Sequence, residues 1–224
     1  MDSEHAMSES STNTAPRTEW IDGLIAQALN GTGINREDAL ELETLTGDEL
    51  DHLFEGTRKI REQFHGRDVK ICSIVNAKSG QCPEVCGFCA QSSAFETESP
   101  EYPLMDVEEI VAKAKEAEAF GSNEFSIVTS GTSMTEREEL DTLKEAIRRI
   151  KAETKLETCC SLGLMSTEHL KELKEAGLDR FHHNLETAAS HFNEIVSTHS
   201  YNDEVRAVEN AKEAGIPVCV GGIF

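Results

Sequence analysis

The feature that most constrains the fold of this chain is a repeated pattern of strand, loop and helix that starts at Val69. Short apolar and β-branched segments predict strands near 69–76, 124–129, 156–162, 179–186 and 216–223. Amphipathic segments predict helices between them, near 106–120, 136–152, 167–176, 188–197 and 203–214. Such alternation predicts an α/β fold with a parallel sheet covered by helices.

Two parallel-sheet architectures fit this alternation, an open doubly wound sheet and a (β/α) barrel of the TIM type. The sequence lacks the glycine-rich phosphate fingerprint that marks the switch point of an open sheet. Its chemistry-bearing residues follow the ends of several different strands, as in barrel active sites. We therefore predict a barrel. Because only about five strands precede Phe224, we expect it to be truncated, with roughly 100 further residues needed for closure.

The residues before the barrel have a different character. Residues 1–18 are rich in Ser, Thr, Glu and Asn, so we expect a disordered acidic and polar tail. Residues 19–66 predict a helical extension, with two short helices, the second starting at Asn35, and a longer one ending near Gly66. The third predicted domain, at 67–224, is the partial barrel.

Composition limits the partners and the compartment. The chain has 42 Asp and Glu against 21 Lys and Arg, a net charge of −21 that repels nucleic acids and anionic membranes. No apolar run approaches the roughly 18 residues that span a bilayer. Seven cysteines, an odd number without a secretory signal, argue against a disulfide framework. We expect a cytoplasmic protein with no nucleic-acid or membrane partner.

Three cysteines on one predicted loop, Cys82, Cys86 and Cys89, indicate metal chemistry. A [4Fe-4S] cluster held by three thiolates keeps one iron without a protein ligand, and that iron can bind a small molecule. A structural zinc site is the alternative, but it needs four ligands, and the other four cysteines are not paired at zinc-knuckle spacing. The triplet therefore predicts an iron–sulfur cluster with one open iron.

Alternation along the predicted fourth strand sorts its side chains between two faces. We expect the polar set to face the barrel interior and the apolar set to face the helices. The inward residues are then His182, Asn184 and Glu186, and the outward residues are Phe181, His183 and Leu185. The barrel mouth is thus expected to carry an imidazole, an amide and a carboxylate.

The four remaining cysteines lie on predicted strands. Alternation places Cys159 inward and Cys160 outward, where it packs as a buried structural thiol. Cys72 shares a face with Asn76, which would be costly to bury against helices, so Cys72 is expected to face inward. Cys219 precedes two glycines, which indicate close approach of a ligand or another backbone. Core packing and a second metal site both fit the three inward thiols.

From about Leu45 onward, the chain resembles the biotin synthase family of radical S-adenosylmethionine (SAM) enzymes. The cysteine triplet alone marks the superfamily, and the ensemble of five stretches marks the family. These are Asn76-Ala-Lys-Ser-Gly80, Cys82 to Ser93, Phe181-His-His-Asn-Leu-Glu-Thr187, Thr198-His-Ser-Tyr201 and Val218-Cys-Val-Gly-Gly-Ile223. The resemblance implies that SAM is cleaved to a radical that removes hydrogen from dethiobiotin, after which sulfur is inserted to give biotin.

The resemblance also implies roles for individual residues. Cys82, Cys86 and Cys89 would hold the [4Fe-4S] cluster, whose open iron binds SAM. The implied SAM contacts are Phe88, against the adenine, and Thr129, Ser130, Gly131, Thr132, Asn184 and Glu186. Asn184 and His182 would contact dethiobiotin. The implied partners are a flavodoxin or ferredoxin as reductant and a second copy of the chain in a homodimer.

An auxiliary [2Fe-2S] or other iron–sulfur cluster is implied as well, with Cys159 and Cys219 as ligands. Relatives add a cysteine on the second strand, where this chain has Ser126, so we expect Cys72 on the neighbouring strand to supply the missing thiolate. His182 also departs from the family, which often carries Asn there. An arginine ligand and a substrate-binding asparagine belong to later strands, so the chain alone is expected not to complete turnover.

Ser126 keeps other readings open. Relatives that need no sulfur donor include a hydrogenase-cofactor maturase and a methylornithine-type mutase of pyrrolysine biosynthesis. A different class of protein, an inactive truncated fragment or iron–sulfur scaffold, also fits. SAM cleavage separates this last possibility from the enzymes.

Overall fold

The computed structural model describes residues 17–223 and divides the chain into two units, Met1–Val69 and Lys70–Phe224. Each unit has a hydrophobic core of its own. All but the last two residues of the expected tail at 1–18 lie outside the described residues. Within residues 17–223, no helix has the length and apolar character needed to cross a membrane.

From residue 17 onward, the first unit consists of three helices, α1 (Thr18–Leu29), α2 (Arg36–Leu42) and α3 (Gly47–His65). The side chain of Asn35 caps α2, and Gly66 ends α3 with a φ of 68°. The helices α1 and α3 pack closely, because a Cβ at Gly56 would lie 1.9 Å from Cδ1 of Ile25. The buried residues at the centre of this unit are Ile21, Ile25 and Leu45.

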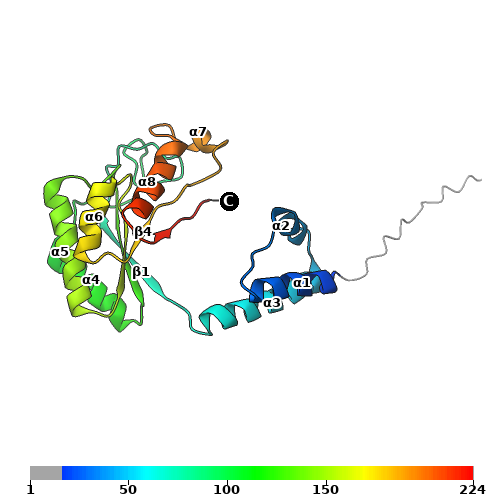
Figure 1. The fold of residues 1–224 in the computed structure, drawn as a ribbon. Coiled ribbons are helices and arrows are strands. Elements are labelled where there is room, and N and C mark those ends of the chain that lie inside the picture. Colours follow the sequence, from blue (N-terminus) through cyan, green and yellow to red (C-terminus); the bar gives the residue numbers. More distant parts are fainter. Residues whose placement is uncertain (1–16, 224) are drawn as a thin grey trace, which may run out of the picture. The chain divides into compact units, whose positions relative to one another are not determined.

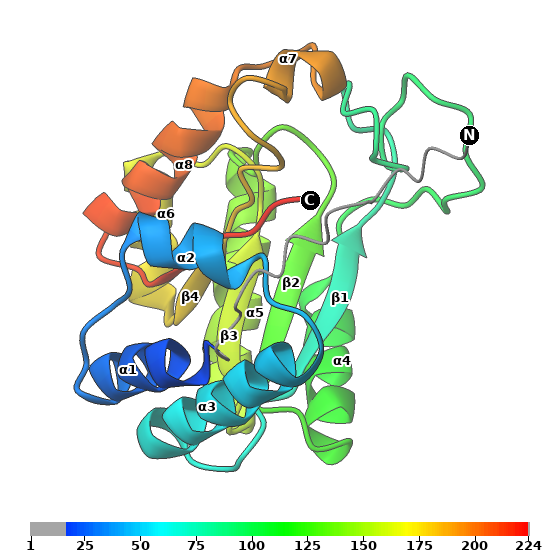
Figure 2. The same cartoon turned by 90° about the vertical axis from the view of Figure 1, so that its right-hand side faces the viewer.

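The second unit contains one parallel sheet of five strands. They are β1 (Cys72–Lys78), β2 (Glu124–Thr129), β3 (Glu157–Ser161), β4 (Arg180–His182) and β5 (Val218–Cys219), and they lie side by side in chain order (Figures 1 and 2). A doubly wound sheet reverses its strand order at a switch point, whereas a barrel adds each strand beside the previous one. The order therefore confirms the predicted barrel-type α/β fold.

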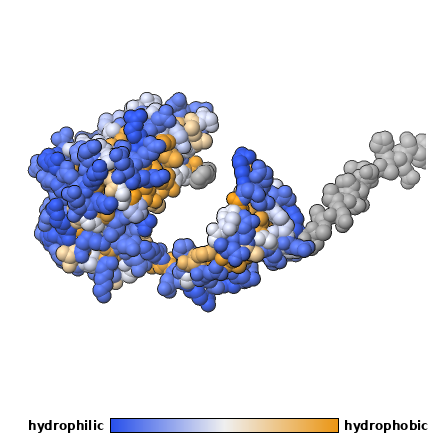
Figure 3. Space-filling view, viewed as in Figure 1, coloured by the Kyte–Doolittle hydropathy of each residue, from blue (hydrophilic) through white to orange (hydrophobic). Residues whose placement is uncertain are grey.

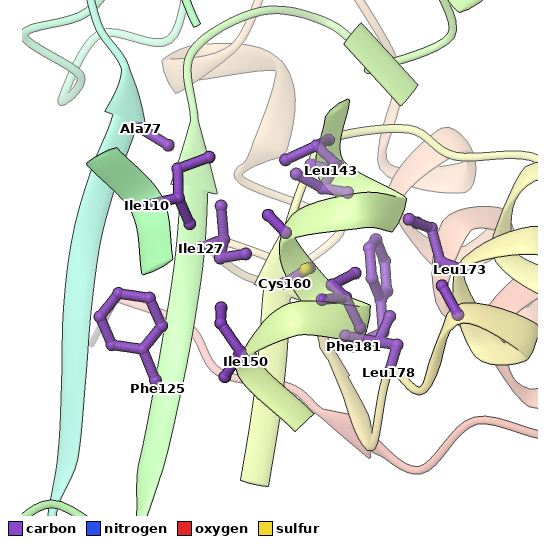
Figure 4. Packing of buried hydrophobic residues seen from close by; sticks show 14 of the residues in the cluster. Ala77, Ile110, Phe125, Ile127, Leu143, Ile150, Cys160, Leu173, Leu178 and Phe181 are labelled. Carbon is purple, nitrogen blue, oxygen red and sulfur yellow. The ribbon is translucent and has the colours of Figure 1, made fainter. Parts of the chain in front are cut away.

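Five helices follow or connect these strands: α4 (Val107–Ala119), α5 (Arg137–Glu153), α6 (Thr167–Ala176), α7 (Phe192–Ile195) and α8 (Tyr201–Glu213). The core lies between the sheet and these helices, where Ile127 of β2 and Phe181 of β4 meet Ile150 of α5 (Figure 4). Cys160 lies in this core with no exposed surface, so its predicted outward orientation is confirmed.

The opposite face of the sheet carries side chains that the helices do not cover. Cys72 and Cys219 are exposed there, and Ile74 is 69% exposed. Figure 3 shows apolar surface on the side of this unit away from α4 and α5. The strand residues that were predicted to face the barrel interior thus lie on the face of the sheet away from the helices.

Three predicted elements, two strands and one helix, are shorter than expected. The strands predicted at 179–186 and 216–223 are regular only at Arg180–His182 and Val218–Cys219, although hydrogen bonds such as Leu185 N to Gly221 O continue the pairing. Glu186 ends this extension because its φ is 61°. The helix predicted at 188–197 is wrong except at Phe192–Ile195, since Val196 instead pairs with Cys86 of a distant loop.

Candidate functional site

The candidate site is a cavity of about 250 Å³ beyond the carboxyl ends of β1 to β4. It brings together the three cysteines of the triplet, the end of β2, the segment after β4 and two side chains of the α8 region. Its lining includes Cys82, Cys86, Cys89, Thr129, Ser130, Gly131, Thr132, His182, Asn184, Glu186, His199 and Glu204. The sequence-predicted residues of the triplet, the SAM contacts and His182 therefore meet in one place.

The cysteine loop folds back on itself after β1. Backbone hydrogen bonds join Cys82 N to Gln91 O at 3.0 Å and Ser93 N to Cys82 O at 2.9 Å. The side-chain oxygen of Gln91 also accepts hydrogen bonds from Ser79 Oγ, at 3.0 Å, and from Gly80 N, at 2.6 Å. These contacts close the loop, so the three thiols are held at one wall of the cavity.

The three thiols influence one another. Burial, followed by the neighbouring Cys89 and Cys82, raises the pKa of Cys86 to about 12. A thiol with such a pKa is neutral in the metal-free protein, and metal binding would release its proton. Several thiolates in this cavity would repel one another, so a bound iron centre, which is cationic, would be needed to stabilise them.

The donor set fits a polynuclear cluster better than zinc. Within residues 17–223, no three His, Cys, Asp or Glu side chains are arranged to share one metal ion. In a four-iron cluster each thiolate binds a different iron, so the thiols lie further apart than the ligands of a single ion. Three thiols are also one fewer than a structural zinc site needs, and all three line one cavity.

The end of β2 contributes one unused hydrogen-bonding group. Ser130 Oγ donates to Gly80 O at 2.8 Å, and Thr132 Oγ1 donates to Glu84 Oε1 at 2.5 Å. Among the described side chains, Thr129 Oγ1 is the one buried polar atom without a hydrogen-bond partner. Because buried polar groups are nearly always paired, Thr129 has a hydroxyl to offer to a bound ligand.

The segment after β4 supplies the polar groups on the other side of the cavity. Asn184 lies over the backbone of Gly221, where an added Cβ would be 2.9 Å from Asn184 Oδ1. Burial, followed by the charge of His183, lowers the pKa of His182 and keeps its imidazole neutral near pH 7. Burial, followed by the charge of Glu204, raises the pKa of Glu186.

Phe88 connects this cavity to a larger and more apolar hollow. It is 45% exposed and lines both the 250 Å³ cavity and a neighbouring hollow of about 830 Å³. The second hollow is formed mainly by the segments after β4 and β5, including Leu185 and Ile223. An exposed aromatic face at this junction can stack on a planar ring.

A second set of thiols lies on the sheet face away from the helices. The pKa of Cys159 is raised to about 11, mainly by burial; a hydrogen bond with Ser126 opposes the shift, and Glu124, Cys72 and Cys219 add to it. The three thiols are therefore close enough to interact. Burial, followed by Glu124, raises the pKa of Cys72 to about 11; Cys219 adds to this shift, and Arg180, which pairs with Cys159 across the sheet, opposes it.

Sequence reasoning missed a group of charged residues behind the triplet. Glu84, within the cysteine loop, lies 2.7 Å from His199 Nδ1, and His199 Nε2 lies 2.7 Å from Glu204 Oε1. Glu204 also contacts His183 Nε2. The available signal was the position of Glu84 between two cysteines of the triplet and of His199 in one of the family stretches, but no residue pattern links positions so far apart.

Comparisons with known proteins agree with this geometry. The family model of the radical SAM superfamily matches residues 77–224. The chain is 46% identical to biotin synthase from Citrifermentans bemidjiense over 206 residues, which cover 92% of this chain and 62% of that protein. Biotin synthase from Geotalea daltonii is 48% identical over 204 residues, or 91% of this chain and 62% of that protein. The chain thus spans about 62% of the length of these relatives.

Solved structures support the fold alone. Methylornithine synthase (PylB) matches with a TM-score of 0.73 at 22% identity and covers 89% of this chain and 58% of its own. HydG, a maturase of the [FeFe]-hydrogenase, matches with a TM-score of 0.76 at 21% identity and covers 94% of this chain and 47% of its own. The strand and helix arrangement is therefore shared by enzymes that carry out different reactions.

Proposed function

Because the chain belongs to the radical SAM superfamily, we propose that it acts as a biotin synthase, which inserts sulfur into dethiobiotin in the last step of biotin formation. The observation that carries the proposal is the joint presence of a three-thiol cavity and 46% identity to biotin synthases across 92% of the chain. Of the two structural neighbours with other activities, neither exceeds 22% identity.

Cys82, Cys86 and Cys89 would hold a [4Fe-4S] cluster, and the cavity beside them would hold SAM. Together these groups, when bound, supply radical chemistry that breaks unactivated C–H bonds. The task of the protein is to orient SAM and substrate and to exclude water from the cavity. A dry cavity prevents side reactions of a reactive species.

Side chains around the cavity would divide the binding of SAM among them. Phe88 offers its ring to the adenine, and Glu186 offers a carboxylate to the ribose hydroxyls. The unpaired hydroxyl of Thr129, within the segment formed by Thr129, Ser130, Gly131 and Thr132, is available to the same ligand.

Two residues after β4 would also reach the substrate. Asn184 can donate and accept hydrogen bonds and would contact both SAM and dethiobiotin. The neutral imidazole of His182 would contact dethiobiotin, whose urea group offers both a donor and an acceptor. A neutral imidazole suits this role because it likewise carries one donor and one acceptor.

A second iron–sulfur cluster, of the [2Fe-2S] or another type, would supply sulfur from the sheet face away from the helices. Cys159 and Cys219 are its proposed ligands, and Cys72 would take the place that Ser126 cannot fill. The mutual effect of these thiols on their pKa values supports this set. Arg180 beside them would offset the negative charge of the thiolates.

The remaining parts of the proposal concern the surroundings of the enzyme. The reductant would be a flavodoxin or ferredoxin, the assembly a homodimer, and the compartment the cytoplasm. Similarity to biotin synthases supports the reductant and the homodimer, and the free thiols, which persist in a reducing environment, support the compartment.

Anaerobic reconstitution tests the proposed function. Iron and sulfide are counted, and the full-length protein, which includes the later strands, is assayed with SAM, dethiobiotin and a reductant for 5′-deoxyadenosine and biotin. Biotin formation, with more iron than one cluster contains, supports the proposal. Formation of 5′-deoxyadenosine without biotin would instead assign the protein to another radical SAM reaction.

Matched cysteine variants test the ligand sets. Cys82→Ala is expected to abolish 5′-deoxyadenosine formation, and Cys72→Ala is expected to remove iron of the second cluster while SAM cleavage continues. Cys160→Ala is the control, since this thiol lies in the core on the opposite face of β3. If Cys72→Ala keeps full iron content and biotin yield, Cys72 is not a ligand.

A further inference from the structure

Two buried carboxylates enclose one imidazole behind the cysteine triplet. Glu84 lies in the loop between Cys82 and Cys86, and its carboxylate contacts His199 Nδ1 at 2.7 Å. The other ring nitrogen of His199 lies 2.7 Å from Glu204 Oε1 of α8. The imidazole therefore bridges the cysteine loop and α8.

The carboxylate of Glu84 is the centre of further contacts. It accepts hydrogen bonds from Thr132 Oγ1, at the end of β2, and from Thr198 Oγ1. Glu204 contacts His183 Nε2 with its second oxygen. One connected network thus joins the cysteine loop to β2, β4 and α8.

Burial makes the pairing of these charges important. The side chains of Glu84, His199 and Glu204 are only 14%, 10% and 8% exposed. A buried charge is costly unless it is paired and hydrogen-bonded. The hydrogen bond to Glu204 raises the pKa of His199, burial opposes this, and the hydrogen bond to Glu84 adds to it, giving a value of about 9. His199 is therefore an imidazolium near pH 7, with a carboxylate on each side.

Backbone contacts run parallel to the side-chain bridge. Cys86 and Val196 form an antiparallel bridge, and Gly87 N donates to Ile195 O at 2.8 Å. Val85 N donates to Thr198 Oγ1 at 3.0 Å. The ligand loop is thus paired with the segment that leads into α8, and that segment ends at His199.

The segment itself has an anchor in the core. Phe192 is fully buried, and its ring meets the edges of His199 and Tyr201 at centroid distances of 5.7 and 5.8 Å. Ser200 and Asp203 form a capping box at the start of α8. His199 is therefore held by packing before any cofactor is present.

We propose that His199 is a positioning residue that holds the cysteine loop ready for the [4Fe-4S] cluster by joining Glu84 to Glu204. Residues 79–105 form no helix or regular strand, so ordering their thiols on binding would carry an entropic cost. A loop ordered in advance avoids this cost at the moment of binding. The inference rests on the proposed cluster site and not on the identity of the substrate.

Cluster binding by the intact protein tests the proposal. His199→Gln removes the charge but keeps hydrogen-bonding groups, and His199→Arg restores a permanent cation that can pair with both carboxylates. His52→Gln is the matched control, because His52 makes a 2.8 Å ion pair with Asp22 outside the second unit. Cluster content is followed by iron and sulfide analysis and by charge-transfer absorbance during anaerobic titration with limiting iron.

We expect His199→Gln to weaken cluster retention against a chelator at least about tenfold, which corresponds to about 1.4 kcal/mol. His199→Arg is expected to restore most of the loss, and His52→Gln to behave as the unmodified protein. Rescue by arginine separates charge-based positioning from a general packing role. The proposal would be overturned if His199→Gln retained its cluster as well as the unmodified protein does. It would also be overturned if His199→Arg lost its cluster as readily as His199→Gln.

Hydrogen exchange of the iron-free protein gives a second measurement. The amides of Val85 and Gly87 are expected to exchange at least about tenfold faster in His199→Gln than in the unmodified protein, because opening of the loop becomes easier. If His199→Gln does not fold, Glu84→Gln, which weakens the same bridge from the other side, is measured instead. Unchanged exchange in a folded variant refutes the proposal. Biotin formation plays no part in either measurement, so loss of the proposed function and loss of this inference remain distinguishable.

Discussion

Stability of the iron-free protein is expected to fall as the pH rises from about 6.5 to about 8, because the unfolded chain loses the His199 proton in this range while the folded protein still holds it. The pKa of His199 is about 9 in the folded protein against an ordinary value of 6.5, with the hydrogen bond to Glu204 as the main cause, burial opposing it and Glu84 adding to it. A raised folded-state pKa stabilises the protein fully below the unfolded pKa. That contribution is lost as the pH rises through the folded pKa.

The magnitude follows from the two pKa values. Linkage gives a contribution of about 3 kcal/mol at pH 6.5 and about 1.4 kcal/mol at pH 8, so the expected loss is about 1.6 kcal/mol. His199 is 10% exposed, so solvent screens its interactions only weakly. The groups that face its ring are Glu84 from the cysteine loop and Glu204 from α8, and both are ionised throughout this range.

Urea denaturation at several pH values measures this loss. The free energy of unfolding is compared between the unmodified protein and His199→Gln. The thiols and the other histidines are common to both proteins, so their contributions to the pH dependence cancel in the difference. The difference between the two proteins is expected to shrink by about 1.6 kcal/mol between pH 6.5 and pH 8. His52→Gln should follow the unmodified protein, because the ion pair with Asp22 that it removes is largely exposed. Parallel curves for His199→Gln and the unmodified protein would refute the assigned charge of His199.

Three further perturbations have defined outcomes. Gly163→Ala is expected to lower the free energy of unfolding by about 2–4 kcal/mol, because its Cβ would lie 2.2 Å from Thr132 O and its φ is 74°. Gly131→Ala has open space around its Cβ, so it should lose only the free energy of the backbone strain at positive φ. Urea denaturation compares the two variants. Burial raises the pKa of Asp179, but Lys151 and the hydrogen bonds from Thr158 together outweigh it and lower the pKa. Asp179→Asn should therefore reduce stability above pH 4 by less than about 1 kcal/mol and flatten the acid side of a thermal-unfolding profile. Because the net charge is −21, the melting temperature should rise between about 0.1 M and about 2 M KCl, and a falling melting temperature would show that the surface ion pairs dominate.

Most of the fold could be predicted because the local signals for the strands and for the longer helices agree with the final structure. The amphipathic pattern predicted a helix near 106–120, and Asp106 forms a capping box with Glu109 at the start of α4. The alternation on β3 correctly separated Cys159 from Cys160. Where prediction failed, at residues 188–197, long-range pairing of Val196 with Cys86 replaces the local helical preference. Local periodicity contains no information about such a partner.

The charged network behind the cysteines was beyond sequence reasoning for the same reason. Glu84 and His199 are 115 positions apart and lie on segments without regular structure. The cavity residues, by contrast, follow from one rule, since the carboxyl ends of neighbouring parallel strands meet at one edge of the sheet. The contact between Glu84 and His199 does not follow from that rule, and it can be recognised only in the folded structure.

Sheet register adds a constraint on the second thiol set that alternation alone cannot give. Alternation puts Cys72 and Ser126 on one face, but Ser126 pairs with Cys159 across the sheet, whereas Cys72 pairs with Glu124, two residues earlier on β2. With a rise of about 3.3 Å per residue, a ligand at Cys72 lies about 6.6 Å closer to the amino ends of the strands than one at position 126. A cluster that uses Cys72 would therefore sit lower in the sheet and leave the Ser126 hydroxyl outside its ligand set. Ser126→Ala is accordingly expected to leave the iron content of the second site unchanged. A loss of iron in that variant would show that Ser126 of β2, and not only Cys72 of β1, takes part in holding the cluster.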